Sequence, residues 1–130
     1  MFSTDDSIVA IATPPGRGGI GVVRISGPLS RDIATRILNR RAPLEPRRAT
    51  LSHVRAAGPA GSDTALAEVV TTYFPAPRSY TGEHVVEISA HGSPVVLHAI
   101  VKSAIDAGAR LAEPGEFTLR AFLNGKRDLI

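Results

Sequence analysis

The 130-residue chain contains no cysteine and no tryptophan, and only 5% of its residues are aromatic. Without cysteine it has no disulfide, no thiolate metal ligand and no cysteine nucleophile. No apolar run reaches the roughly 18 residues that a membrane-spanning helix needs. Asp5 and Asp6 stand where a secretory signal would carry basic residues. Because 43% of the residues are hydrophobic and 21% are charged, we expect one cytoplasmic domain with an ordinary core.

Lysine is also scarce, since only Lys102 and Lys126 occur among the 15 basic residues and the net charge is +3. So small an excess does not establish nucleic-acid binding. The densest basic cluster lies among prolines and consists of Arg40, Arg41, Arg47 and Arg48. A solvated loop and an RNA contact both fit this cluster, and the loop is the simpler interpretation.

Motifs for metal binding and for hydrolysis are missing as well. No two of the four histidines have a recognised zinc spacing on one element. The sequence has no Gly-x-Ser-x-Gly motif, which would place a serine nucleophile on a strand-to-helix turn. We therefore expect no catalytic residue and no metal ligand in this chain.

Glycines 16, 18 and 21 have the Gly-x-Gly-x-x-Gly spacing of a dinucleotide-binding motif. That motif requires a helix after the glycines, whose N-terminal N–H groups bind pyrophosphate. Here the next residues are Val22, Val23, Arg24 and Ile25, which favour a strand. We expect instead that the glycines form a tight turn between two strands and so place Arg24.

Period-two alternation and turn residues predict strands at 7–13, 20–26, 49–56, 66–74, 85–89 and 109–112. Helices are expected at 31–39 after a Ser30 cap, and at about 116–123, with Phe117, Ala121 and Phe122 in the core. The clearest helix begins with Ser93 as cap and Pro94 as first residue, and Gly108 ends it.

Arg24 and Glu87 each place one charge among apolar neighbours in a predicted strand. A buried charge without a partner is strongly unfavourable, so each needs an opposite charge, solvent or a polar ligand. The two side chains either pair with each other, point outward from a one-sided sheet, or line a ligand pocket. In the pocket, the carboxylate would accept adjacent N–H donors and the guanidinium would bind a carboxylate or carbonyl.

Lys126 follows Gly125 just beyond the last predicted helix. The pair is not a phosphate-binding P-loop, because Arg127 stands where Ser or Thr is required. Lys126 either complements the helix dipole, which is the simpler role, or reaches an anionic ligand tail. Because the chain stops at Ile130 without a terminal tail, we expect it to be a first domain or a fragment of a longer protein.

Four blocks, at residues 8–21, 74–83, 87–92 and 114–126, resemble in order and spacing the N-terminal region of the MnmE (TrmE) family of tRNA modification GTPases. Residues 29–64 resemble this family only in outline. Ser93 stands where the family usually has the second Gly of His-Gly-Gly-Pro, and Ser remains a good helix cap.

The resemblance implies an α+β fold, with a mixed, mostly antiparallel sheet packed by about three helices, similar to the tetrahydrofolate-binding domain of aminomethyltransferases. It implies a folate-binding and homodimerisation domain over residues 1–118 and the start of a helical domain over 119–130. It also implies that Arg24, Glu87 and Lys126 contact 5-formyl- or 5,10-methylene-tetrahydrofolate. The N–H groups of a pterin suit a carboxylate, and its carboxylated tail suits cations.

For the longer protein, the resemblance implies addition of an aminomethyl or carboxymethylaminomethyl group to C5 of the wobble uridine of tRNA. Folate would supply the one-carbon unit, and the FAD-dependent protein MnmG (GidA) would be the partner. GTP, potassium and magnesium would bind outside this chain, which has no GTPase site of its own. Two alternatives stay open: a purely structural dimerisation module with a degenerate folate pocket, and the folate domain of an aminomethyltransferase-like enzyme.

Overall fold

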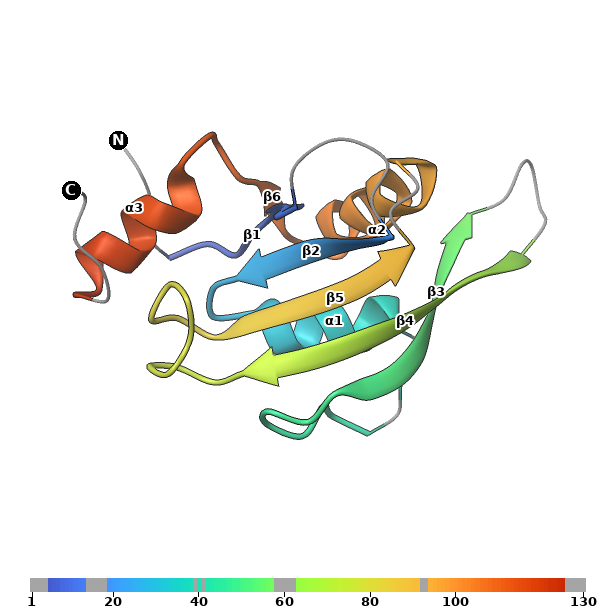
Figure 1. Cartoon of the computed structure of the whole chain (residues 1–130), viewed down its shortest axis with the longest axis horizontal. Coiled ribbons are helices and arrows are strands. Elements are labelled where there is room, and N and C mark those ends of the chain that lie inside the picture. Colours follow the sequence, from blue (N-terminus) through green and yellow to red (C-terminus); the bar gives the residue numbers. More distant parts are fainter. Residues whose placement is uncertain are drawn as a thin grey trace.

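The computed structural model describes residues 5–13, 19–38, 40, 42–57, 63–91 and 94–125. Within them the chain forms a six-stranded sheet and three helices, which confirms the expected α+β fold (Figure 1). The strands are β1 (Ile8–Ile11), β2 (Ile20–Ser26), β3 (Thr50–Ala57), β4 (Asp63–Phe74), β5 (Val85–His91) and β6 (Arg110–Leu111). The helices are α1 (Ser30–Ile37), α2 (Pro94–Asp106) and α3 (Glu116–Leu123).

The sheet has the strand order β3-β4-β5-β2-β1-β6. All neighbours pair antiparallel except β1 and β6, which run parallel, so the sheet is mixed and mostly antiparallel as expected. β5 extends two residues beyond the predicted end at Ser89, because Ala90 and His91 pair with Gly21 and Ile20 of β2. Cross-strand partners, rather than local propensity, therefore set the strand ends.

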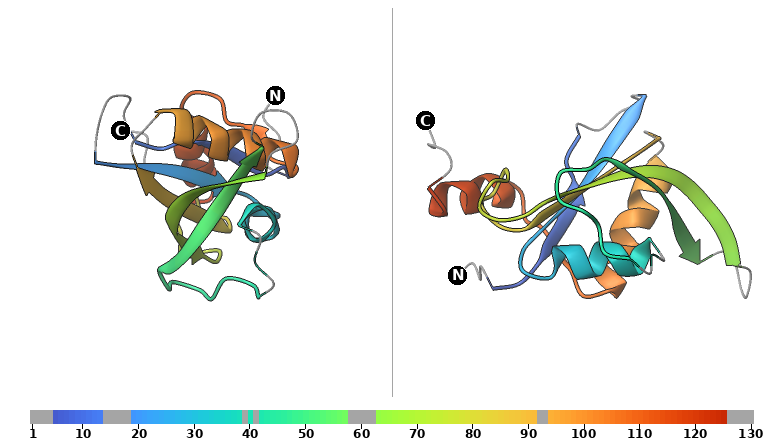
Figure 2. Two further views of the ribbon diagram at one scale, coloured as in Figure 1. Left: turned by 90° about the vertical axis from the view of Figure 1, so that its right-hand side faces the viewer. Right: turned by 90° about the horizontal axis from the view of Figure 1, so that it is seen from below.

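Helices α1 and α2 lie on the same side of the sheet (Figure 2). Alternate residues of the central strands point toward these helices and are buried, including Val23 and Ile25 of β2 and Val86 and Ile88 of β5. The other residues of these strands, such as Arg24 and Glu87, lie on the opposite face. α3 lies apart from the other two helices, at one end of the sheet (Figure 1). Among the described residues, no helix covers the middle of the opposite face, which we call the open face.

The helix ends follow the sequence at α3 and after α2, and they depart from it at both ends of α1, which was expected at 31–39 and runs over Ser30–Ile37. α3 has the predicted bounds, and Gly108 follows α2 with a φ of 118°, a conformation that favours glycine. The Ser30 cap was wrong, because Leu29 takes the cap position and Ser30 lies inside α1. The Ser30 hydroxyl donates to the carbonyl of His84 at 2.9 Å, so a tertiary partner replaces the local one. The predicted Ser93 cap lies outside the described residues.

The predicted glycine turn was wrong at Gly21, while glycines 16 and 18 lie outside the described residues. Gly21 is part of β2 and pairs with Ala90 of β5. A Cβ atom at this position would lie 2.4 Å from Cδ1 of Leu97, a buried residue of α2. Gly21 thus lets α2 pack directly on the sheet, rather than turning the chain.

We expect Gly21→Ala to lower the free energy of unfolding by about 1–3 kcal/mol, because the new methyl group overpacks the contact with Leu97. Urea unfolding measures this change. Gly19→Ala is the matched control, because a Cβ there meets no atom within 4 Å. In a double-mutant cycle, Leu97→Ala should cost less in the Gly21→Ala background than alone. Additive effects of the two substitutions would contradict this explanation.

Candidate functional site

Arg24 and Glu87 are direct partners on the neighbouring strands β2 and β5. The Nε group of Arg24 donates to Oε2 of Glu87 at 3.0 Å, and the side chains are only 18% and 29% exposed. The structure therefore confirms that the two charges pair with each other. Only Oε2 of Glu87 is used, and Oε1 has no hydrogen-bond partner within the described part of the chain. A ligand therefore has an acceptor available beside the ion pair.

Two aromatic rings adjoin the guanidinium of Arg24. Its Cζ atom lies 4.5 Å from the centre of the Tyr80 ring and 5.3 Å from that of Phe117, both within the range of cation–π attraction. The Tyr80 hydroxyl lies 3.3 Å from Oγ1 of Thr118. Tyr80 comes from the segment between β4 and β5, and Phe117 from α3. Their contact with Arg24 was not predicted, because nothing in the sequence spacing brings these segments together.

The expected core role of the α3 side chains holds for only part of the helix. Ala121 is fully buried, but Phe122 is exposed and Phe117 is half-buried beside Arg24. The predicted boundary between residues 118 and 119 falls inside α3, and the domain division stays a prediction.

A cluster of five charged side chains joins α3 to the rest of the fold, and we call it the Arg120 cluster: Asp6, Glu83, Arg110, Glu116 and Arg120. The Arg120 side chain is 1% exposed. Its Nη1 donates to the Asp6 carbonyl at 2.8 Å and to Glu83 Oε1 at 3.1 Å. Its Nη2 donates to Asp6 Oδ1 at 2.6 Å and to Glu116 Oε2 at 3.3 Å.

Arg110 completes the Arg120 cluster from β6. It donates through Nε to Asp6 at 2.6 Å and through Nη1 and Nη2 to Glu116 at 3.1 and 2.7 Å. Glu116 also accepts from the N–H of Glu113, and its side chain is fully buried. Sequence analysis missed this cluster. The four-residue spacing of Glu116 and Arg120 was the one local feature that indicated a pair.

Hydrogen bonds to arginine lower the pKa values of two carboxyl groups in the cluster. The hydrogen bond from Arg110 is the main cause that lowers the pKa of Asp6, with a further contribution from Arg120. For Glu116, burial acts to raise the pKa, but the hydrogen bonds from Arg110 and from the Glu113 N–H outweigh it. Hydrogen bonds to Glu116 and Asp6 in turn raise the pKa of Arg110. All three groups therefore stay charged near neutral pH.

Of the other residues that the sequence singles out, the structure describes three members of the basic cluster, Arg40, Arg47 and Arg48. Lys126 lies outside the described residues, and so does Arg41. Local groups bind the other members of the basic cluster: Arg48 pairs with Glu45 at 3.0 Å, and Arg47 donates to the Arg78 carbonyl at 2.7 Å. Arg40 donates to the Ala42 carbonyl at 3.3 Å. These contacts favour the loop interpretation, and the RNA contact stays a prediction.

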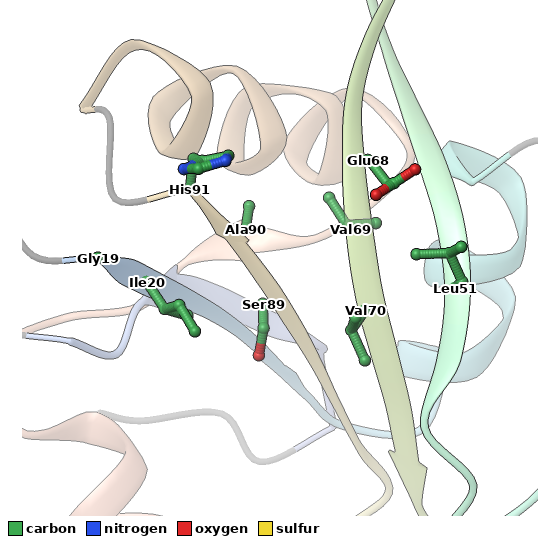
Figure 3. Close-up of a pocket in the computed structure, with 9 residues that line it drawn as sticks. All are labelled: Gly19, Ile20, Leu51, Glu68, Val69, Val70, Ser89, Ala90 and His91. Atoms are coloured by element: carbon green, nitrogen blue, oxygen red, sulfur yellow. The ribbon is translucent and has the colours of Figure 1, made fainter.

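A shallow pocket of about 310 Å³ lies on the open face (Figure 3). Its lining residue Ser89 is two residues along β5 from Glu87, so the pocket adjoins the row of paired residues that holds Arg24 and Glu87. In the adjoining row, Ser89 of β5 pairs with Val70 of β4. The apolar side chains Ile20 and Leu51 are 67% and 61% exposed here. The lining residues are Gly19, Ile20, Leu51, Glu68, Val69, Val70, Ser89, Ala90 and His91. The pocket is therefore largely apolar with polar groups at its rim.

The described residues form neither a membrane-spanning helix nor a metal-binding cluster. None of their helices has the length and apolar character to cross a membrane. No group of three or more His, Asp or Glu side chains in these residues is arranged to hold a metal ion.

A family model described as "GTP-binding protein TrmE N-terminus" matches residues 7–126. The chain belongs to this TrmE N-terminus family. It is 55% identical over 131 residues to the tRNA modification GTPase MnmE of Koribacter versatilis, which covers 98% of this chain and 28% of that protein. It is 56% identical over 125 residues to the MnmE of Legionella pneumophila strain Corby, in an alignment that covers 96% of this chain and 27% of that protein. The chain thus spans little more than a quarter of these TrmE relatives, and the resemblance stated from the sequence is confirmed.

The lowered pKa values of Asp6 and Glu116 predict a loss of stability in acid. Both pKa values lie below those of the unfolded chain. The two carboxylates therefore contribute fully to the free energy of unfolding above roughly pH 5, and this contribution is lost as the pH falls through the pKa values of the folded chain. We expect Glu116→Gln to flatten the acidic limb of unfolding free energy against pH, measured by urea unfolding. Glu45→Gln, at an exposed ion pair, is the control and should leave the limb unchanged. An acidic limb of wild-type slope in Glu116→Gln would refute this assignment.

Proposed function

We propose that this chain binds a tetrahydrofolate derivative at the Arg24–Glu87 pair. The observation that carries the proposal is a paired but incompletely used carboxylate, beside two aromatic rings, on the open face of the sheet. An ion pair in this position is not needed to fill the core. A partly buried polar pair with aromatic neighbours is instead typical of sites for planar, hydrogen-bonding ligands.

The hydrogen-bonding groups of the Arg24–Glu87 pair fit a folate. Glu87 has Oε1 available to accept from the adjacent N–H groups of a pterin, and Arg24 uses only Nε in the ion pair. The Nη groups of Arg24 suit a carbonyl or carboxylate. Lys126, outside the described residues, is proposed for the anionic tail. When bound, the folate would supply a one-carbon unit, while the side chains of this chain bind and orient it.

The family suggests the larger setting of this activity. The relatives are named tRNA modification GTPases, and we infer that the chain acts within such a protein in the cytoplasm. The modification would be an aminomethyl or carboxymethylaminomethyl group at C5 of the wobble uridine, made with the flavoprotein MnmG. GTP, potassium and magnesium would bind outside these 130 residues. Similarity to the aminomethyltransferase folate domain is part of the same proposal.

Homodimerisation is the second part of the proposal, and the apolar pocket on the open face supports it. Ile20 and Leu51 expose large apolar surface there, which a second copy would bury. His91 and Glu68 lie at opposite sides of the pocket (Figure 3). A two-fold axis between them would bring His91 of each copy toward Glu68 of the other, whose carboxylate lies 3.8 Å from His53 Nε2 in its own chain.

Calorimetry with 5-formyltetrahydrofolate tests the ligand site. We expect saturable binding by the 130-residue chain, and about 10- to 100-fold weaker binding by Glu87→Ala, because a charge-assisted hydrogen bond is lost. Glu45→Ala removes a carboxylate far from the pair and should bind as the wild type does. Unchanged affinity in Glu87→Ala would exclude the assigned site. A dimer that binds no folate would instead select the purely structural alternative.

Light scattering over a dilution series tests the dimer surface. We expect Ile20→Glu and Leu51→Glu to shift the chain toward monomer, because each buries a charge in the proposed interface. Val95→Glu is the matched control, since Val95 is 78% exposed on α2 and lies off the open face. A dimer of equal strength in all three variants would show that the interface lies elsewhere.

A further inference from the structure

We propose that Arg120 is a positioning residue for the Arg24–Glu87 site, and this inference rests on the function proposed above. Arg120 would act through Tyr80 and Phe117, the two rings that adjoin the Arg24 guanidinium. Its own bonds go to the N-terminal segment, to the 79–83 turn and to α3. A single buried guanidinium therefore connects the segments that carry both rings.

The first ring, Phe117, comes from the same helix as Arg120. The two residues are three positions apart on α3, so they lie on one face of the helix. Arg120 is held by Asp6 and Glu83 from outside the helix, which fixes this face toward the sheet. The rotation of α3 that brings Phe117 to within 5.3 Å of Arg24 therefore depends on these bonds.

The second ring, Tyr80, comes from the turn that ends in Glu83. Oε1 of Glu83 accepts hydrogen bonds from Nη1 of Arg120 at 3.1 Å and from the hydroxyl of Ser26 at 2.8 Å. Ser26 is two residues after Arg24 in β2, so both lie on the open-face side of that strand. Glu83 thus fixes the turn to the strand that carries Arg24, and Tyr80 is brought over the guanidinium.

The Arg120 cluster is suited to rigid positioning. Arg120 uses both Nη groups, and charge-assisted hydrogen bonds of this kind combine strength with a defined direction. Asn124 adds a second link between α3 and the turn, because its Nδ2 donates to the Thr81 carbonyl at 2.9 Å. Side chains that support a binding site in this manner commonly change affinity without touching the ligand.

The test follows the Nε–H resonance of Arg24 in the 15N-labelled chain, assigned by its loss in Arg24→Lys. The two rings shift this resonance, so it reports their position without any ligand. We expect Arg120→Met to move it toward the position of an unstacked arginine and to weaken 5-formyltetrahydrofolate binding about tenfold.

Arg31→Met is the matched control. Like Arg120, Arg31 donates to a backbone carbonyl, that of Leu44 at 2.7 Å, and it stacks on the ring of Tyr73 at 4.8 Å. It lies on α1, away from α3. We expect Arg31→Met to lower thermal stability while leaving both the Arg24 resonance and the folate affinity unchanged. This control distinguishes a general loss of stability from a change in the position of the two rings beside Arg24.

Thr118→Val is a milder variant, which removes the Tyr80 hydroxyl's partner on α3 and leaves the Arg120 cluster intact. It should move the Arg24 resonance in the same direction by a smaller amount. The inference is overturned if folded Arg120→Met keeps the wild-type resonance, or if the resonance moves and the affinity does not. If Arg120→Met does not fold, an unmoved resonance in Glu83→Ala, which removes the partner of Arg120 on the turn that carries Tyr80, overturns it. Absence of folate binding by the wild-type chain refutes the proposed function instead, and the resonance alone then decides the positioning role.

Discussion

The burial of Arg120 among Asp6, Glu83 and Glu116 is the constraint on which the geometry of the site depends. A guanidinium that is 1% exposed is tolerated only when several acceptors satisfy it. Here the acceptors come from the N-terminal segment, the turn before β5 and α3 itself. These parts of the chain are therefore held in one arrangement by electrostatics and hydrogen bonding rather than by apolar packing.

The two faces of the sheet have different roles, because helices α1 and α2 cover one face and leave the middle of the other open. On one face, Gly21 lets α2 approach closely enough to bury Leu97, and the aliphatic core forms there. The open face keeps Arg24 and Glu87 only partly covered, so their ion pair is neither lost in the core nor fully solvated. Tyr80 and Phe117 supply the missing cover. A polar pair beside aromatic rings and an apolar pocket is the arrangement that supports ligand binding on this face.

Much of the fold could be predicted from the sequence, because strand alternation and helix-ending residues are local features. β2 and α3 have the predicted bounds, and Gly108 ends α2 as expected. The failures occurred where a distant residue decides the local role. Ser30 bonds to the His84 carbonyl instead of capping α1, and Gly21 is required by Leu97 rather than by a turn. Neither partner is near in sequence, so no local pattern indicates it.

The sequence by itself determined the α+β class, the family and the two strand charges that form the candidate site. The ordered motifs carry the resemblance to the family, and the resemblance implied the α+β class. The alternation of apolar residues indicated the two strand charges, and both features are properties of the chain itself. Only the tertiary structure decided that Arg24 pairs with Glu87, that Tyr80 and Phe117 adjoin Arg24, and that the Arg120 side chain of α3 is buried. Strand register and the packing of α3 depend on contacts between residues far apart in the chain. A charged side chain is stable in a buried position only when its partners of opposite charge are also in place, so these contacts form together.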